Sequence, residues 1–231
     1  MKRFYDTVDV GDIDHGWQVR LDGRGIKTIM GSPQVVPTRA LAEALAREWA
    51  EQGKEIDPAR FVMRDMADFA IDLVQPDPAA AIATLIRFAE SDTLCYRADP
   101  DEPLFVRQQE VWEPLLAAIE AREGISFTRV SGIIHRTQPG QTLARLRQRL
   151  ASHDHFTLAA LQTMASLSAS LCIALLALED GADPASLWRA ASLEEEWQAD
   201  LWGRDHEAEE RRAQRQEAFL AAAEFARLAR A

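Results

Sequence analysis

The spacing of apolar residues changes character near residue 38. Before that point, apolar and polar residues alternate, and the stretches "WQVRL" and "RGIKTIM" flank Asp22-Gly23. A two-residue Asp-Gly connection between alternating stretches is typical of a β-hairpin. "RFYDTVDV" predicts one more strand before this hairpin, and "QVV" predicts a short strand after it. The pattern therefore predicts strands that are confined largely to residues 1–36.

From Thr38 onward, apolar residues recur at three- and four-residue steps, which is the helical period. Thr38 is a candidate N-cap for a helix that carries one apolar stripe, formed by Leu41, Leu45 and Trp49. Asp57-Pro58 and Asp77-Pro78 each have the form of a cap followed by a first-turn proline. Each of these dipeptides therefore predicts the start of a helix.

The rest of the chain keeps the helical period. Helices are predicted between Leu104 and Gly124 and at about 141–151, 155–179, 184–203 and 205–230. One stretch among them, "ISFTRVSGII" at 125–134, has strand character and predicts a short extended segment.

These elements predict an α+β fold. The turn-rich stretch "QPDPAA" is the first clear candidate for a boundary between domains. We therefore expect a small strand-rich N-terminal domain at 1–75, which includes one or two helices. A larger, mostly helical C-terminal domain is expected at 76–231.

The segment 156–178 contains no charged residue and is long enough to span a bilayer. It contains several Ser and Thr residues, however, and has neither Lys or Arg anchors nor an aromatic belt at its ends. We therefore expect the central helix of a soluble bundle and no membrane insertion. The opening "MKRFYDTVDV" resembles neither a secretory signal nor a transit peptide, so the expected location is the bacterial cytoplasm.

Composition narrows the classes of function. The net charge of −11 argues against non-specific binding of nucleic acid, which relies on Lys and Arg at the phosphates. Cys95 and Cys172 match no zinc or redox spacing and are expected to be small buried side chains. Phosphate-binding loops and nucleophile motifs are also missing, so no catalytic residue or cofactor is predicted.

Two alternatives stay open at this level. One is a metal-dependent hydrolase that uses His153, His155 and His206. Residues two apart lie about 200° around a helix axis, so His153 and His155 could not chelate together there, and a capping role for Asp154 is simpler. The other is a regulator that binds a small molecule between the two domains.

The segment "LEEEWQADLWG" at 193–203 carries the most informative surface pattern. On a helix, Leu193, Trp197 and Leu201 form one apolar stripe and are predicted to be core. Glu194 lies about 60° from that stripe, Glu196 about 100° on the other side and Glu195 about 160° away, so the three cannot converge on one metal. Trp202 lies off the stripe. It either forms a protein-binding patch with the acids or folds back into the core after Gly203.

Several stretches, in order and over nearly the whole length, resemble one family. They are "KRFYDTVDV", "LDGRGIKT", "VPTRALAEALAREWAEQ", "FAIDLV", "SDTLCYRAD", "QQEVWEPLL", "LASHDHFTLAAL" and "SLEEEWQADLWG". The family is that of the assembly chaperones for the F1 part of ATP synthase that escort its alpha subunit. One departure is "HGWQVRL", where the family more often has a Gly-Gly pair.

The resemblance implies a non-enzymatic chaperone that binds the free alpha subunit and covers the surface that later pairs with beta. It implies no cofactor or metal. It places partner binding on the acidic run, with Glu194 preferred and with Glu195, Glu196 and Trp202 beside it. It also marks four positions as structural: Trp49, Asp92, Tyr96 and Trp112. The sequence does not fix the oligomeric state, for which a monomer is the simplest expectation.

Overall fold

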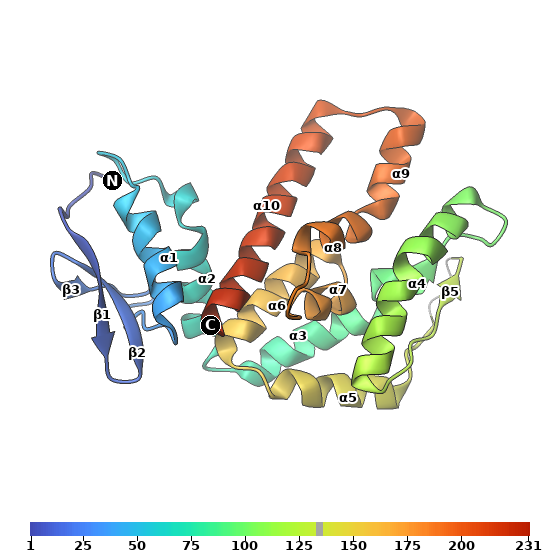
Figure 1. The fold of residues 1–231 in the computed structure, drawn as a ribbon, viewed down its shortest axis with the longest axis horizontal. Helices are drawn as coiled ribbons and strands as arrows, with labels where there is room; N and C mark the ends of the chain where they lie inside the picture. The colour runs from blue at the N-terminus through green and yellow to red at the C-terminus, as the bar shows by residue number, and fades with distance from the viewer. Residues whose placement is uncertain (133–135) are drawn as a thin grey trace. The chain divides into compact units, whose positions relative to one another are not determined.

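The computed structural model describes residues 1–132 and 136–231 (Figure 1). Its contacts group into two compact units. The first unit comprises Met1–Pro78, Asp154–Ala160 and Glu224–Ala231, and the second comprises Ala79–His153 and Leu161–Ala223. Strands lie near the N-terminus and helices dominate the rest, which confirms the predicted α+β class.

A three-stranded antiparallel sheet occupies the first unit. Its strands are β1 (Val8–Ile13), β2 (Gly16–Leu21) and β3 (Arg24–Gly25), in the order β1-β2-β3. The predicted hairpin is confirmed, with φ of 49° at Asp22 and 76° at Gly23, as a two-residue turn with both φ values positive requires. The strand predicted at "QVV" is wrong, because this stretch forms only an isolated bridge between Trp17 and Val36.

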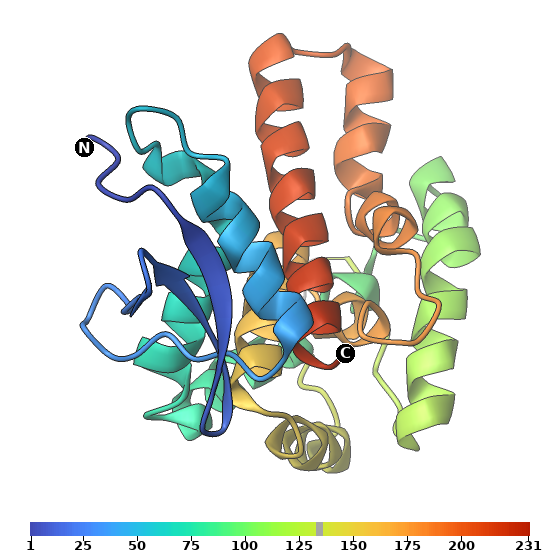
Figure 2. The same cartoon turned by 60° about the vertical axis from the view of Figure 1, so that its left-hand side comes forward.

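Helix α1 (Arg39–Ala50) packs on the sheet (Figure 2). Thr38 caps it as predicted, since the Thr38 side chain accepts a hydrogen bond from the Leu41 amide. Asp57 caps only a short 3-10 turn, η1 (Pro58–Arg60), before α2 (Val62–Phe69) begins. Helix α2 continues into the π-helical turn η2 (Ala70–Val74).

The second unit is built mainly from helices. They are α3 (Pro78–Glu90), α4 (Pro103–Glu123), α5 (Gly140–Ala151), α7 (Leu171–Leu176), α8 (Pro184–Ala191) and α9 (Leu193–Trp202). Helices α6 (His155–Ser168) and α10 (His206–Ala229) contribute residues to both units. After the 3-10 turn η3 (Thr93–Cys95), β4 (Tyr96–Arg97) pairs in parallel with β5 (Val130–Ser131). Strand β5 lies in the extended segment predicted at 125–134, of which Ile133 and Ile134 are outside the described residues.

The helix predicted at 155–179 is not continuous. It breaks after Ser168, where Ala169 has a φ of 50° that no helix accommodates. Helix α7 then starts anew, because the Ser170 hydroxyl accepts from the Ile173 amide and so caps it. The apolar pattern continues through both helices, so the break could not be predicted from it.

The helix predicted at 184–203 is also divided. At Ser192, ψ is 9°, and this departure from helical geometry separates α8 from α9. Asp154 does cap α6, accepting hydrogen bonds from the amides of Phe156 and Thr157 at 2.8 and 3.0 Å.

In the part of the chain that is described, no single helix is long and apolar enough to cross a membrane. One bent pair of consecutive segments, Val62–Val74 and Pro78–Cys95, passes that test only jointly, by length and composition.

Candidate protein-binding site

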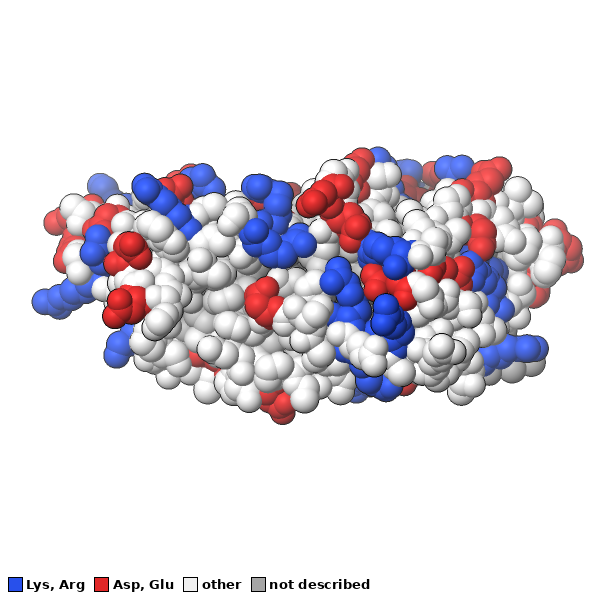
Figure 3. Space-filling view, turned by 60° about the horizontal axis from the view of Figure 1, so that its bottom comes forward, with Lys and Arg blue, Asp and Glu red and all other residues white. Residues whose placement is uncertain are grey.

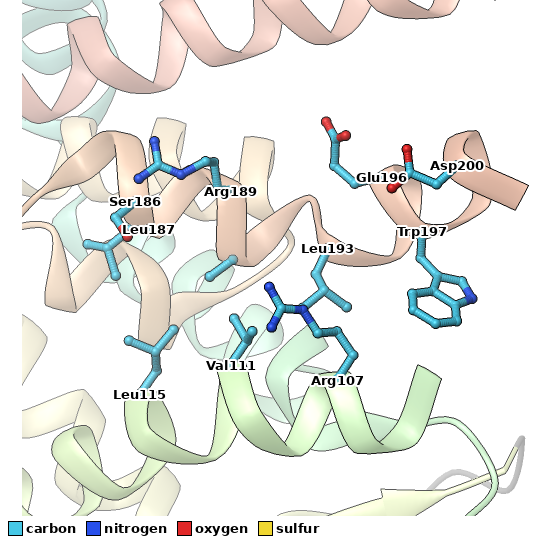
Figure 4. A pocket seen from close by; sticks show the side chains of 11 residues that line it. Arg107, Val111, Leu115, Ser186, Leu187, Arg189, Leu193, Glu196, Trp197 and Asp200 are labelled. Atoms are coloured by element: carbon cyan, nitrogen blue, oxygen red, sulfur yellow. The ribbon is translucent and has the colours of Figure 1, made fainter. Parts of the chain in front are cut away.

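Helix α9 carries the acidic run and lies between α4 and α10 within the second unit (Figure 1). Leu193, at its start, is buried as predicted. Leu201 is 61% exposed, so its assignment to the core is wrong. Figure 4 shows Trp197, one turn before Leu201 in the sequence, near the end of α4 that carries Arg107.

Glu194 points toward α4, whereas Glu195 and Glu196 both reach arginines of α10. Glu194 accepts a hydrogen bond from Gln108 of α4, with 2.6 Å between Nε2 and Oε1. Glu195 pairs instead with Arg215 of α10 at 2.9 Å. Glu196 pairs with Arg212 of α10 at 2.8 Å. The run therefore does not form one acidic centre, in agreement with the helical geometry.

Glu194 differs from its two neighbours in having no cation beside it. No Arg or Lys of residues 1–132 and 136–231 forms a salt bridge with it. Burial raises the pKa of Glu194, and the hydrogen bond from Gln108 opposes that shift. Gln108 is itself fully buried, and its Oε1 accepts from the Ala98 amide at 2.8 Å. Glu194 is thus a half-buried carboxylate that is hydrogen-bonded to the side-chain amide of Gln108, which the Ala98 amide holds in place.

A groove runs between α4 and the helices α8 and α9, with a volume of about 580 Å³ (Figure 4). We call it the α4–α9 groove. Its apolar lining is formed by Val111, Leu115, Leu187, Ala190, Leu193 and Trp197. Charged side chains of both signs border it: Arg107, Arg189, Glu196 and Asp200. Such an apolar floor with a polar rim is the usual anatomy of a protein-binding surface.

A second hollow, of about 370 Å³, lies where α9 turns into α10. Gly203 ends α9, with a φ of 95°, and Trp202 is 79% exposed beside this hollow. The side chain of Trp202 is therefore exposed and does not fold back into the core after Gly203. Glu195 and Arg215 also line the hollow, and they are paired with each other.

The net charge of −11 does not make the surface uniformly acidic. Figure 3 shows a face on which basic and acidic side chains are interspersed, with stretches that carry neither. Many of the acids of α9 and α10 are paired with arginines of α10 or with Arg204 in the loop between the two helices. A partner would therefore meet a mixed surface at this site, where individual unpaired charges matter more than the total.

Trp49 is buried in the first unit, with 9% of its surface exposed. Its ring lies edge-on to Tyr5 at 5.6 Å and against Phe61 at 4.5 Å. The Tyr5 hydroxyl donates to the Trp49 carbonyl at 2.6 Å. Trp49 is thus placed as a packing residue.

The other three marked residues lie in the second unit. Asp92 is fully buried and joins η3 to the start of α7, as it accepts from Ser170 Oγ at 2.7 Å and from the Cys172 amide at 2.9 Å. Trp112 of α4 is fully buried and donates from Nε1 to the Ala190 carbonyl of α8 at 2.7 Å. Tyr96 is half-buried in β4, opposite Val130. None of the three lines the α4–α9 groove.

The residues of α4 that face the acidic run were not identified from the sequence. Gln108 is 86 positions from Glu194, and Arg107 and Val111 line the groove from the same helix. Gln108 and Val111 lie in the stretch "QQEVWEPLL", which carries part of the family resemblance, but nothing in that stretch indicates a contact with the acidic run. Among the described residues, no group of three or more His, Cys, Asp or Glu is placed to hold a metal ion.

The same fold occurs in solved structures of other proteins. Atp12 from Paracoccus denitrificans is 34% identical, with a TM-score of 0.94, covering 99% of this chain and 98% of that one. A proposed chaperone from Agrobacterium tumefaciens is 37% identical, with a TM-score of 0.93, covering 98% and 85%. The mitochondrial protein atp12 of Schizosaccharomyces pombe is 27% identical over 204 residues, 83% of this chain and 70% of that protein.

The matching family and one of the solved relatives are described as chaperones, so this chain is a chaperone rather than an enzyme. Residues 2–120 match the family described as ATP12 chaperone protein. The chain belongs to the ATP12 chaperone family, which confirms the resemblance found in the sequence.

Proposed function

We propose that this chaperone acts in the assembly of the F1 sector of ATP synthase. It binds the free alpha subunit and covers the surface with which alpha later pairs with beta. A subunit interface that is exposed before assembly is a large apolar surface, and such surfaces aggregate. Membership of the ATP12 family and the sequence resemblance support this role. Because the two solved relatives are bacterial, we propose the bacterial cytoplasm as its location.

The observation that carries the proposal is the α4–α9 groove with its apolar floor. A helix or an extended segment of the client would place apolar side chains against Val111, Leu193 and Trp197. Leu201 and Trp202 of the same helix are also exposed, and Trp202 borders the second hollow. Large aromatic side chains are the ones that most often dominate binding energy at such surfaces.

Glu194 supplies the polar part of the proposed recognition. Its carboxylate is half-buried and accepts a hydrogen bond, and no Arg or Lys in the described part of the chain forms a salt bridge with it. An Arg or Lys of the alpha subunit that reached it would pair with it in a partly desolvated place, which favours specificity and association rate. Glu195 and Glu196 already have arginine partners and therefore have less to gain.

The test is capture of purified, freshly released alpha subunit by the purified chain. Glu194→Gln removes the charge and leaves an oxygen that can still accept from Gln108, so we expect lost capture at an unchanged melting temperature. Glu195→Gln is the comparison in the same helix and should weaken capture less, because Glu195 already pairs with Arg215. Full capture by Glu194→Gln would remove this residue from the site, and no capture by the unchanged chain would refute the proposed function.

Trp202→Ala tests the apolar part separately. Since Trp202 is 79% exposed, its removal should leave the fold intact while weakening capture at least about tenfold, as loss of a dominant aromatic contact does. Phe4→Ala is a matched control, because Phe4 is an aromatic residue that is 62% exposed in the other unit. Equal capture by both variants would argue against a contact at Trp202.

A further inference from the structure

A loop in the first unit presents two large apolar side chains to solvent. Ile29 is 82% exposed and Met30 is 68% exposed. They occupy a three-residue loop that is closed by a hydrogen bond from the Thr28 amide to the Ser32 carbonyl at 2.8 Å, with Gly31 at a φ of 93°. Loops of this length are usually built from Gly, Asn, Asp and Ser. Two adjacent apolar residues at such a tip are therefore unexpected for a solvated turn.

Two aspartates hold this loop in place. They are one helical turn apart, Asp68 at the end of α2 and Asp72 in η2. The Ile29 amide donates to Asp68 Oδ2 at 3.2 Å, and the Met30 amide donates to Asp72 Oδ2 at 3.2 Å. The Thr28 hydroxyl donates to Asp72 Oδ1 at 2.8 Å. The backbone of both apolar residues is thus fixed, and their side chains are kept outward.

The loop borders a hollow of about 390 Å³, which we call the tip hollow. Its larger apolar side chains are Ile29, Met30, Phe69 and Leu73. Its charged side chains are Arg64, Asp65, Asp68 and Asp72. Leu73 is 57% exposed, so the apolar residues form one accessible surface and are not scattered singly.

The charges around the tip hollow are mostly acidic. Three aspartates and one cation, Arg64, line the hollow. Arg64 already pairs with two of the aspartates, because its Nε lies 3.3 Å from Asp65 and 3.5 Å from Asp68. An apolar floor that is bordered by more carboxylates than cations favours a ligand that is apolar with a positive charge beside it. It disfavours an acidic ligand for the same reason.

We propose that the tip hollow is a docking surface for an apolar segment of a partner polypeptide that carries a Lys or Arg. The apolar side chains of the segment cover Ile29, Met30 and Leu73. Its cation lies beside Asp65 and Asp72. The fixed loop binds without first having to be ordered, which lowers the entropic cost of docking. This surface belongs to the first unit and is separate from the α4–α9 groove of the second.

The first experiment uses the full chain and two labelled synthetic peptides, one of alternating Leu and Lys and one of alternating Leu and Glu. We expect the unchanged chain to bind the Lys peptide, and the double variant Ile29→Ser, Met30→Ser to bind it at least about tenfold more weakly. Phe4→Ser, which removes an apolar residue exposed to 62% elsewhere in the same unit, should bind like the unchanged chain. Equal binding by the double variant, or preference for the Glu peptide, would overturn the proposal.

A second experiment asks whether the proposed client uses this surface, and only here does the inference rest on the proposed function. Capture of alpha subunit should fall in the double variant at an unchanged melting temperature. If the unchanged chain captures no alpha subunit, the proposed function fails, while the peptide measurement still decides the tip hollow. Sedimentation tests a second copy as the occupant: a dimer that the double variant abolishes would show a self-interface and overturn the proposal.

Discussion

The fully buried carboxylate of Asp92 is hydrogen-bonded to two segments of the second unit, η3 and the start of α7. It accepts from the Leu94 amide at 3.1 Å, the Cys172 amide at 2.9 Å and the Ser170 hydroxyl at 2.7 Å. Asp92→Ala leaves the two amides without an acceptor, and each stranded buried donor costs about 1–3 kcal/mol. Removing a buried carboxylate offsets part of this cost, so we expect a loss of about 2–4 kcal/mol in the free energy of unfolding.

Asp154→Ala is the matched control for this variant. Asp154 also accepts from two amides, those of Phe156 and Thr157, but it is exposed. Water can replace its carboxylate, so only an ordinary capping loss of about 1 kcal/mol is expected. Both free energies come from urea unfolding followed by circular dichroism. If Asp92→Ala costs no more than Asp154→Ala, the argument from stranded buried donors is refuted.

The pH dependence gives a second check on Asp92. Burial raises the pKa of Asp92, and the hydrogen bonds from Cys172 and Ser170 oppose that shift only in part. The folded state therefore holds the proton more tightly than the unfolded state does. The resulting stabilisation is present below the unfolded pKa of about 3.9 and is lost as pH rises through the folded pKa. Asp92→Asn cannot ionise, so its stability relative to the unchanged chain should rise over that interval. A difference independent of pH would contradict the assigned shift.

Three further changes test packing and capping by the same urea measurement. Trp49→Ala should cost about 3–5 kcal/mol, because it empties a buried aromatic site, and an unchanged midpoint would contradict its packing role. Trp112→Phe leaves the Ala190 carbonyl without its donor and should cost about 1–3 kcal/mol; a loss within error would show that bond to be dispensable. Thr38→Ala removes the cap on Leu41 and should cost about 1 kcal/mol, whereas Arg39→Ala at the exposed next position should cost less.

The elements that could be predicted are those set by neighbouring residues. The Asp22-Gly23 hairpin follows from two residues that tolerate positive φ. The start of α1 follows from one hydroxyl at Thr38 that accepts from the amide three positions on. In both cases the determining contact lies within a few positions of the element, so the pattern in the sequence carries it.

The break between α6 and α7 depends on a contact that the local pattern does not contain. Ser170 and Cys172 bond to Asp92, which is 78 and 80 positions away. A buried carboxylate at that point supplies acceptors for donors at the start of α7 and so stabilises a new helix start. The apolar residues on either side read as one helix because both helices are buried nearly all round. Periodicity measures burial, and the apolar residues before and after the break are buried alike.

The acidic run illustrates the same limit at the candidate site. Helical geometry alone indicated that Glu194, Glu195 and Glu196 diverge, and the structure has them reaching α4 on one side and α10 on the other. Which glutamate keeps an unpaired charge depends on the two neighbouring helices, since Arg212 and Arg215 lie on α10 whereas α4 offers Glu194 only the amide of Gln108. An amide satisfies one oxygen without neutralising the carboxylate. That difference in partners, rather than the angle around the helix, is the physical reason to assign recognition of a cation to Glu194.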